Sequence, residues 1–166
     1  MFRFELMELS LLALTDYREF WKKMQDESRV EIVFPEGKIQ TLEDLCNFWQ
    51  TCWVYFGYQE GKLVGAVWFS NHSPDECYIN FISFKGFKMT AEAREQIEAL
   101  IDGIFDNSLK MEYKIKGRTP YLGLIRIFCR WGFRKNGMLK EAMYDAFHSE
   151  WVTLYDCIMK KSERVQ

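Results

Sequence analysis

Apolar and polar residues recur along the chain with two different periods. A spacing of three to four residues predicts helices over residues 15–27 and 90–106, the second capped by Thr90. A shorter helix is expected to begin at Thr41, because Asp44 follows three residues later, as in a capping box. The chain therefore contains amphipathic helices that need a surface to pack on.

A period of two residues predicts strands in the segments between these helices. The expected strands cover residues 2–9, 53–58, 63–70, 77–84, 109–116, 133–140 and 150–159. The turn at 59–62 contains Gly61, which favours a β-hairpin between two of them. The alternation is strict over 109–116, and this pattern is typical of a half-buried strand.

One further helix is predicted between the last strands. It opens at Thr119-Pro120, with proline in the first helical position, and it ends at Gly132. The order β-α-α-β-β-β-α-β-α-β-β indicates the α/β class with a mixed sheet, in which strands two to four form a meander. We expect a single domain over residues 1–166.

The composition supports a folded domain and argues against membrane insertion. The chain has 166 residues, of which 48% are hydrophobic, enough to bury a core. Its apolar runs are far shorter than the roughly 20 residues that span a bilayer. Charged residues interrupt the segment Met1–Leu14, so no signal peptide is expected. These features predict a cytoplasmic protein without a membrane partner.

The cysteines do not suggest a metal centre. The five cysteines include no Cys-x-x-Cys pair, and the chain has only two histidines. A zinc site needs clustered ligands. We therefore expect no metal, and we interpret the cysteines as reduced thiols packed in the core.

Charge is distributed unevenly along the chain, although the net charge is only −2. Residues 1–108 hold 10 basic and 18 acidic side chains, whereas residues 109–140 hold 9 basic and 1 acidic. This basic segment could bind the phosphates of a cofactor, a nucleic acid, or acidic side chains of the same molecule. The net charge argues against nucleic acid.

The order of elements and three short segments resemble the GNAT superfamily of N-acetyltransferases. Ile127–Phe133 is similar to the family's helix end followed by Gly-Phe, Gly61–Gly65 to its hairpin between strands two and three, and Val152–Lys160 to its last strand. This resemblance implies a GNAT-like fold and acetyl-coenzyme A as co-substrate.

The resemblance also implies where the cofactor binds. In the family, a helix N-terminus after the fourth strand receives the pyrophosphate, since its free N–H groups and dipole favour an anion. The pantetheine arm pairs with the backbone of that strand. The implied cofactor-binding residues are Phe81, Ile82, Ser83, Lys88, Met89, Thr90, Ala91, Glu92, Ala93 and Phe128. Here Ala91 replaces a glycine, and Glu92 adds a negative charge where the pyrophosphate is expected.

Two positions bear on the chemistry. The family's tyrosine, which protonates the departing thiolate, corresponds to Phe128, and Tyr121 is a substitute hydroxyl earlier on the same helix. A base near the start of strand four would be Glu76, with Asp75 and His72 beside it. Glu76 and Tyr121 are the expected catalytic residues.

Two classes of function follow. One is an acetyl-coenzyme A-dependent N-acyltransferase, in which a primary amine of a small molecule or peptide attacks directly in a ternary complex. The other is an inactive GNAT-fold binding or assembly protein, as occurs among divergent, bacteriophage-encoded members; the altered cofactor segment and Phe128 favour it. Nucleic-acid binding ranks third, and a homodimer is compatible with either class.

Overall fold

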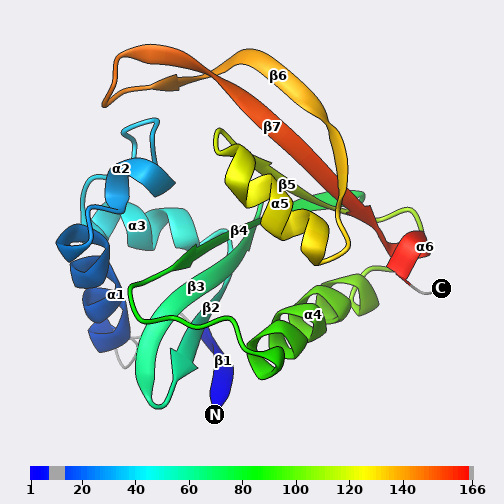
Figure 1. Cartoon of the computed structure of the whole chain (residues 1–166), viewed down its shortest axis with the longest axis horizontal. Coiled ribbons are helices and arrows are strands. Elements are labelled where there is room, and N and C mark those ends of the chain that lie inside the picture. Colours follow the sequence, from blue (N-terminus) through cyan, green and yellow to red (C-terminus); the bar gives the residue numbers. More distant parts are fainter. Residues whose placement is uncertain (8–13, 165–166) are drawn as a thin grey trace.

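A computed structural model describes residues 1–7 and 14–164. One seven-stranded sheet runs through the molecule in the order β1-β2-β3-β4-β5-β7-β6 (Figure 1). Of the adjacent strand pairs in the described residues, only β4 and β5 run parallel, and the other pairs are antiparallel. The strands are β1 (Phe2–Met7), β2 (Trp53–Gln59), β3 (Lys62–Ser70), β4 (Glu76–Ser83), β5 (Lys114–Thr119), β6 (Arg134–Asp145) and β7 (Glu150–Lys160). The mixed α/β sheet and the β2-β3-β4 meander are confirmed.

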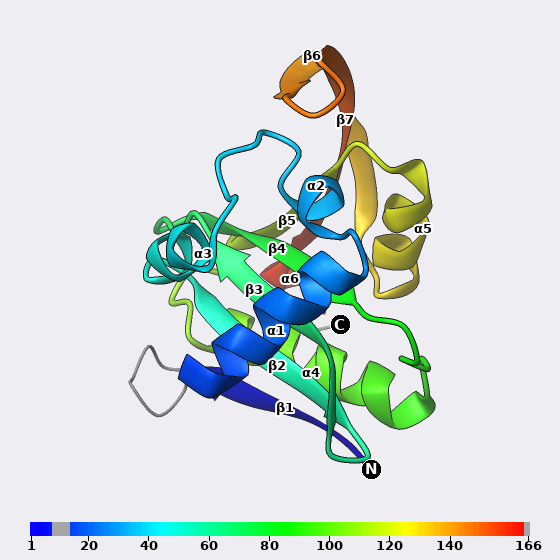
Figure 2. The same cartoon turned by 90° about the vertical axis from the view of Figure 1, so that its left-hand side faces the viewer.

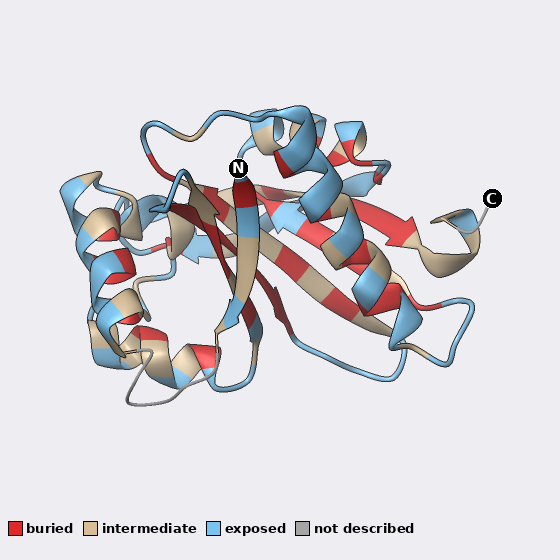
Figure 3. Ribbon diagram, turned by 90° about the horizontal axis from the view of Figure 1, so that it is seen from below, coloured by how far each residue is buried: buried red, intermediate tan, exposed pale blue. Residues whose placement is uncertain are grey.

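Helices cover the two faces of this sheet, as Figures 1 and 2 show. The helices are α1 (Leu14–Asp26), α2 (Val30–Val33), α3 (Leu42–Trp49), α4 (Ala91–Asp106), α5 (Leu122–Arg130) and α6 (Lys161–Arg164). Helices α1 and α3 pack with side chains of β2 and β3 in one core, and α4 and α5 pack on the opposite face in another. Figure 3 shows the buried residues on the sheet and on the helix sides that face it.

Local capping explains where two helices begin. The hydroxyl of Thr41 accepts the N–H of Asp44, whose carboxylate accepts the N–H of Thr41 in return. The hydroxyl of Thr90 likewise accepts the N–H of Ala93. Both caps were predicted from the sequence and are confirmed.

The strand predicted over 109–116 is wrong in its position. Leu109 and Met111 are exposed, and the strand begins at Lys114 and continues to Thr119. The alternation keeps its phase, since Ile115 and Gly117 face the core. Its limits follow from pairing, because β4 and β7 offer partners only from Lys114 onward. Periodicity identified the buried face but not the ends of the strand.

The helix predicted to open at Thr119-Pro120 is corrected in the same way. Thr119 is the last residue of β5, and α5 begins at Leu122 after Tyr121 as its N-cap residue. The hydroxyl of Thr119 accepts the N–H of Tyr121 and ends the strand. The helix stops before Gly132, whose φ of 95° is accessible to glycine.

Strands β6 and β7 form a long hairpin that arches away from the rest of the sheet (Figures 1 and 2). Strand β6 runs to Asp145, beyond the predicted end at Lys140. At the tip, the N–H of Ala146 donates to the carbonyl of Pro35 at 2.8 Å, in the loop after α2. Helices α2 and α6 were not predicted, since four residues carry too little periodicity. None of the described helices combines the length and apolar character needed to cross a membrane.

Candidate functional site

Strands β4 and β5 separate after a short paired stretch. Their parallel register joins Glu76 to Lys114, Cys77 to Ile115 and Tyr78 to Lys116, and it continues no further. Residues 79–83 of β4 therefore have backbone groups on this side that no neighbouring strand uses. The split exposes the edge of a central strand to any extended ligand that can pair with it.

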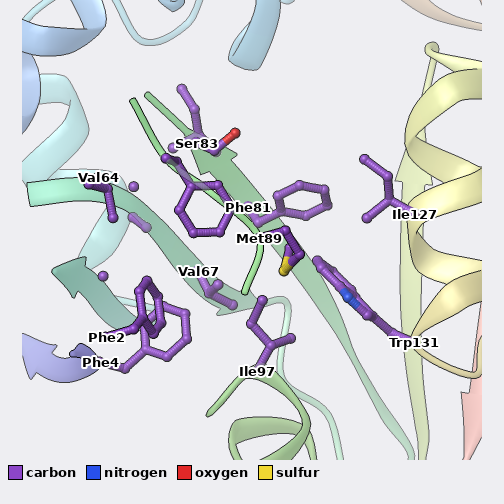
Figure 4. A pocket seen from close by; sticks show the side chains of 15 residues that line it. Phe2, Phe4, Val64, Val67, Phe81, Ser83, Met89, Ile97, Ile127 and Trp131 are labelled. Atoms are coloured by element: carbon purple, nitrogen blue, oxygen red, sulfur yellow. The ribbon is translucent and has the colours of Figure 1, made fainter. Parts of the chain in front are cut away.

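An apolar pocket of about 270 Å³ lies beside this part of β4 (Figure 4). Its wall comes from β1, β2, β3, β4, the loop before α4, and both α4 and α5. The lining residues are Phe2, Phe4, Gly57, Val64, Gly65, Ala66, Val67, Phe81, Ile82, Ser83, Phe87, Met89, Ile97, Ile127 and Trp131. Four of the predicted cofactor-binding residues, namely Phe81, Ile82, Ser83 and Met89, are thus brought together.

Phe128 lies behind the pocket wall and not on it. It is 3% exposed and packs edge-on against Phe81 and Trp131, with ring centroids 5.3 and 5.8 Å away. A Cβ on Gly117 of β5 would lie 2.9 Å from this ring, so only glycine allows so close an approach. Phe128 therefore has a core position between α5 and the sheet, and its cofactor contact stays a prediction.

The N-terminus of α4 opens next to the pocket. The side chain of Gln59 bonds to the backbone of Lys88 in both directions, and this holds the preceding loop in place. Within the described residues, the N–H groups of Ala91 and Glu92 have no partner, as is usual for the first turn of a helix. These groups could receive an anion.

The Glu92 carboxylate has a structural partner. It accepts the backbone N–H of Phe2 at 2.9 Å and lies 3.9 Å from the terminal ammonium of Met1. Ala93 of α4 packs with Phe2 of β1 and Val64 of β3 in a small apolar cluster. The negative charge at this helix start therefore anchors β1 to α4.

The two predicted catalytic residues lie near opposite ends of β5, Glu76 on the neighbouring strand β4 and Tyr121 in the chain after β5. Glu76 pairs with Lys114 at the start of that strand, and its carboxylate lies 2.7 Å from the Lys116 ammonium. Tyr121 lies two residues after Thr119, the last residue of β5. Thr119 is five residues beyond Lys114, which corresponds to roughly 16 Å along a parallel strand. Burial and the nearby charge of Asp145 raise the pKa of the Tyr121 hydroxyl, which keeps it protonated. The structure does not bring these two groups together.

The two residues beside Glu76 are otherwise engaged. Asp75 pairs with the Lys110 ammonium, and this contact lowers the pKa of its carboxyl. The His72 ring packs against Trp53 in a tilted arrangement with centroids 4.1 Å apart, and burial lowers the pKa of His72. Both side chains are thus engaged in contacts within the protein.

Much of the basic segment is neutralised within the molecule. Lys110, Lys116, Arg118 and Arg134 pair with Asp75, Glu76, Asp156 and Glu163, respectively. Acidic side chains of the same molecule, one of the three partners expected for this segment, therefore pair with four of its nine cations.

Sequence reasoning missed the helix side of the pocket. Ile127 and Trp131 are four residues apart and therefore lie on one face around α5, next to each other in the pocket wall. Their four-residue spacing is visible in the sequence and could have predicted that the two side chains lie together. Phe2, Phe4 and Phe87 reach the pocket only through the fold, because β1 and the loop before α4 are brought together across β2 and β3.

Comparison with models of known families gives no match, and no curated protein is similar in sequence. Solved structures are similar in fold. A spermidine N-acetyltransferase from Vibrio cholerae, in complex with CoA and spermine, superposes with a TM-score of 0.74 at 14% identity, over 99% of this chain and 98% of that one. A ribosomal-protein-S5-alanine acetyltransferase from Vibrio fischeri gives 0.71 at 12% identity, over 96% and 93%.

A probable acetyltransferase of the GNAT family from Chromobacterium violaceum gives a TM-score of 0.76 at 14% identity, over 99% of this chain and 86% of that one. These likenesses extend over nearly the whole chain, from β1 to β7. At such identities they concern the path of the backbone and not the side chains of a site. The chain thus has the fold of the GNAT acetyltransferases.

Proposed function

We propose that residues 1–166 form one acyltransferase domain that transfers an acetyl group from acetyl-coenzyme A to a primary amine. The observation that carries this proposal is the apolar pocket beside the unpaired edge of β4, which is lined by Met89, two residues before the first residue of α4. An extended pantetheine arm could pair with the backbone of residues 81–83, while its pyrophosphate accepts the N–H groups of Ala91 and Glu92. The neighbour from Vibrio cholerae binds CoA within the same fold.

The chemistry needs no covalent enzyme intermediate. The neutral amine nitrogen attacks the thioester carbonyl carbon, so that a C–N bond forms and the C–S bond breaks. The amine loses one proton, and the departing thiolate gains one. The chain offers two candidates for these proton transfers, Glu76 as a base acting through water and Tyr121 as an acid. Because they lie near opposite ends of β5, no more than one of them acts at the reacting thioester, and water exchanges the other proton.

Binding of the co-substrate separates this proposal from other functions of the fold. Acetyl-coenzyme A should bind the full chain in titration calorimetry and raise its melting temperature, because a ligand that binds only the folded state stabilises it. Ile127→Trp should weaken this binding at least tenfold, since the larger side chain enters the pocket from α5. Leu122→Trp is the matched control, because Leu122 is exposed on the same helix and does not line the pocket.

The outcomes have different meanings. If acetyl-coenzyme A at millimolar concentration gives neither heat nor a thermal shift, the proposal is wrong. Binding without transfer to any amine would favour the inactive binding or assembly protein, with which the core position of Phe128 is compatible. Equal weakening by both tryptophan variants would show that the pocket is not the binding site.

A further inference from the structure

The sheet face opposite α4 and α5 carries a polar cluster at the β4–β5 split. Strand residues alternate between faces, and Ile115, Cys157 and Met159 belong to the core under α4 and α5. Tyr78, Lys116, Arg118 and Asp156 therefore point to the other face. The register places Tyr78 beside Lys116 and Arg118 beside Asp156. An acceptor that approaches the split from this side would meet the accessible side chains of this cluster, Tyr78, Lys116 and Arg118.

The carboxylates of this cluster are already paired. Asp156 is 6% exposed and accepts from the Arg118 Nε at 3.2 Å and from the Asn136 Nδ2 at 2.7 Å. The Glu76 carboxylate lies 2.7 Å from the Lys116 ammonium. A polycationic acceptor would have to compete with these internal cations for both carboxylates.

Arg118, in contrast, has hydrogen-bond donors to spare. Only its Nε is used, and its two terminal nitrogens have no partner within the described residues. The guanidinium lies 5.1 Å from the centroid of the Tyr78 ring, and one third of the side chain is exposed. The ion pair with buried Asp156 and the contact with Tyr78 hold the guanidinium in place. A fixed guanidinium with free terminal N–H groups matches the two oxygens of a carboxylate.

Two more donors lie on the same face. The Lys116 ammonium is 5.7 Å from the centroid of the same Tyr78 ring. Trp68, opposite Asn80 in the β3–β4 ladder, is 3% exposed, and its indole N–H has no partner among the described residues. The two carboxylates of this face are already paired, whereas the terminal nitrogens of Arg118 and the indole N–H of Trp68 have no partner among the described residues. A ligand that brings negative oxygens would supply acceptors for such donors.

We propose that the acceptor is a small amino acid-type molecule, an amine that also carries a carboxylate, and that Arg118 binds this carboxylate. The inference rests on the proposed acetyl transfer and names its substrate class. Cations near the bound amine also disfavour the ammonium form, and this increases the fraction of neutral amine that can attack. Arg118 is thus a specificity-determining residue, and a polyamine, the ligand of one structural neighbour, does not match the charges here.

The test compares acceptors that differ only in the carboxylate. Thiol release from acetyl-coenzyme A is measured with the full chain and each free L-amino acid, with the corresponding amino acid amides, and with spermidine. We expect at least one amino acid to have a KM roughly 10- to 100-fold below that of its amide, as charge-assisted hydrogen bonds contribute. Spermidine should be a poorer acceptor than this amino acid.

Variants then test the assignment to Arg118. Arg118→Gln should bring the ratio of the two KM values close to one, and Arg118→Lys should leave an intermediate ratio because it keeps the charge without the planar fork. Arg126→Gln is the matched control, since Arg126 is exposed on α5. It should keep the wild-type ratio. Melting curves and acetyl-coenzyme A calorimetry on each variant establish that it is folded and still binds the co-substrate.

The failures are distinguishable. If acetyl-coenzyme A does not bind at all, the proposed function falls, and this inference falls with it. If acetyl-coenzyme A binds and is consumed with spermidine or amides as efficiently as with amino acids, the proposed acetyl transfer stands and the inference about the acceptor is overturned. If it binds but no amino acid is an acceptor, the inference is overturned as well. An unchanged KM ratio in Arg118→Gln also overturns it.

Discussion

Replacing Phe128 by tyrosine tests whether this position faces a wet cleft or a dry core. The Phe128 ring is 3% exposed and is surrounded by Phe81, Trp131 and Phe133, with centroid distances of 5.2 to 5.8 Å. Its Cζ, where the new hydroxyl would stand, lies 2.9 Å from the position of a Cβ on Gly117. The hydroxyl would therefore point into β5 and not into the pocket.

The expected cost has two parts. A buried hydroxyl without a partner costs about 1–3 kcal/mol. Overpacking against β5 costs about another 1–3 kcal/mol. The free energy of unfolding should thus fall by about 2–6 kcal/mol, which lowers the melting temperature by about 4 °C or more for a chain of this size.

Urea unfolding followed by tryptophan fluorescence measures this change. Phe147→Tyr is the matched control, because Phe147 is 38% exposed at the tip of the β6–β7 hairpin and should change stability by less than about 0.5 kcal/mol. An acyl-transfer assay runs in parallel. If Phe128→Tyr is as stable as the control and transfers acetyl groups faster than wild type, the position faces the reacting thioester and the core assignment is refuted.

Two further predictions concern titratable groups. The hydrogen bond from His148 lowers the pKa of the Asp145 carboxyl, and the same contact raises the pKa of His148. Their pairing therefore stabilises the hairpin tip below the usual histidine pKa of about 6.5, and this contribution is lost as pH rises through the raised value. The stability difference between wild type and His148→Gln should shrink from pH 6 to pH 8.5 in urea titrations, and a difference independent of pH would contradict the pairing. Burial raises the pKa of the thiols of Cys77 and Cys157 to about 11 and 12. Mass spectrometry after iodoacetamide treatment at pH 8 should find both unmodified in native protein and modified in urea, because the thiolate is the reactive form; native labelling of either would show that it is accessible.

The sequence by itself determined the local structure and, through it, the type of fold. Helix starts at Thr41 and Thr90 depend on hydrogen bonds within four residues, so a local pattern is sufficient to predict them. The hairpin of β2 and β3 depends on a two-residue turn with positive φ at Glu60 and Gly61. Because these elements follow one another in a distinctive order, the sequence also led to the GNAT-like mixed sheet.

The tertiary structure decided everything that depends on which residues become neighbours. Strand β5 is displaced toward Thr119 because pairing with β4 and β7, and not alternation, sets its ends. Phe128 became a core residue because Gly117 admits its ring, and no spacing along the chain relates these two positions.

The same holds for charges. Glu92 was expected to repel a pyrophosphate, whereas in the fold its carboxylate accepts the N–H of Phe2, ninety residues earlier. In the sequence, Arg118 is only one cation of a basic segment. In the fold, pairing of β5 with β7 places it beside Asp156, and β4 places Tyr78 under its guanidinium. The effect of a charge depends on distance and burial, and both are set by contacts between residues that are far apart in the sequence.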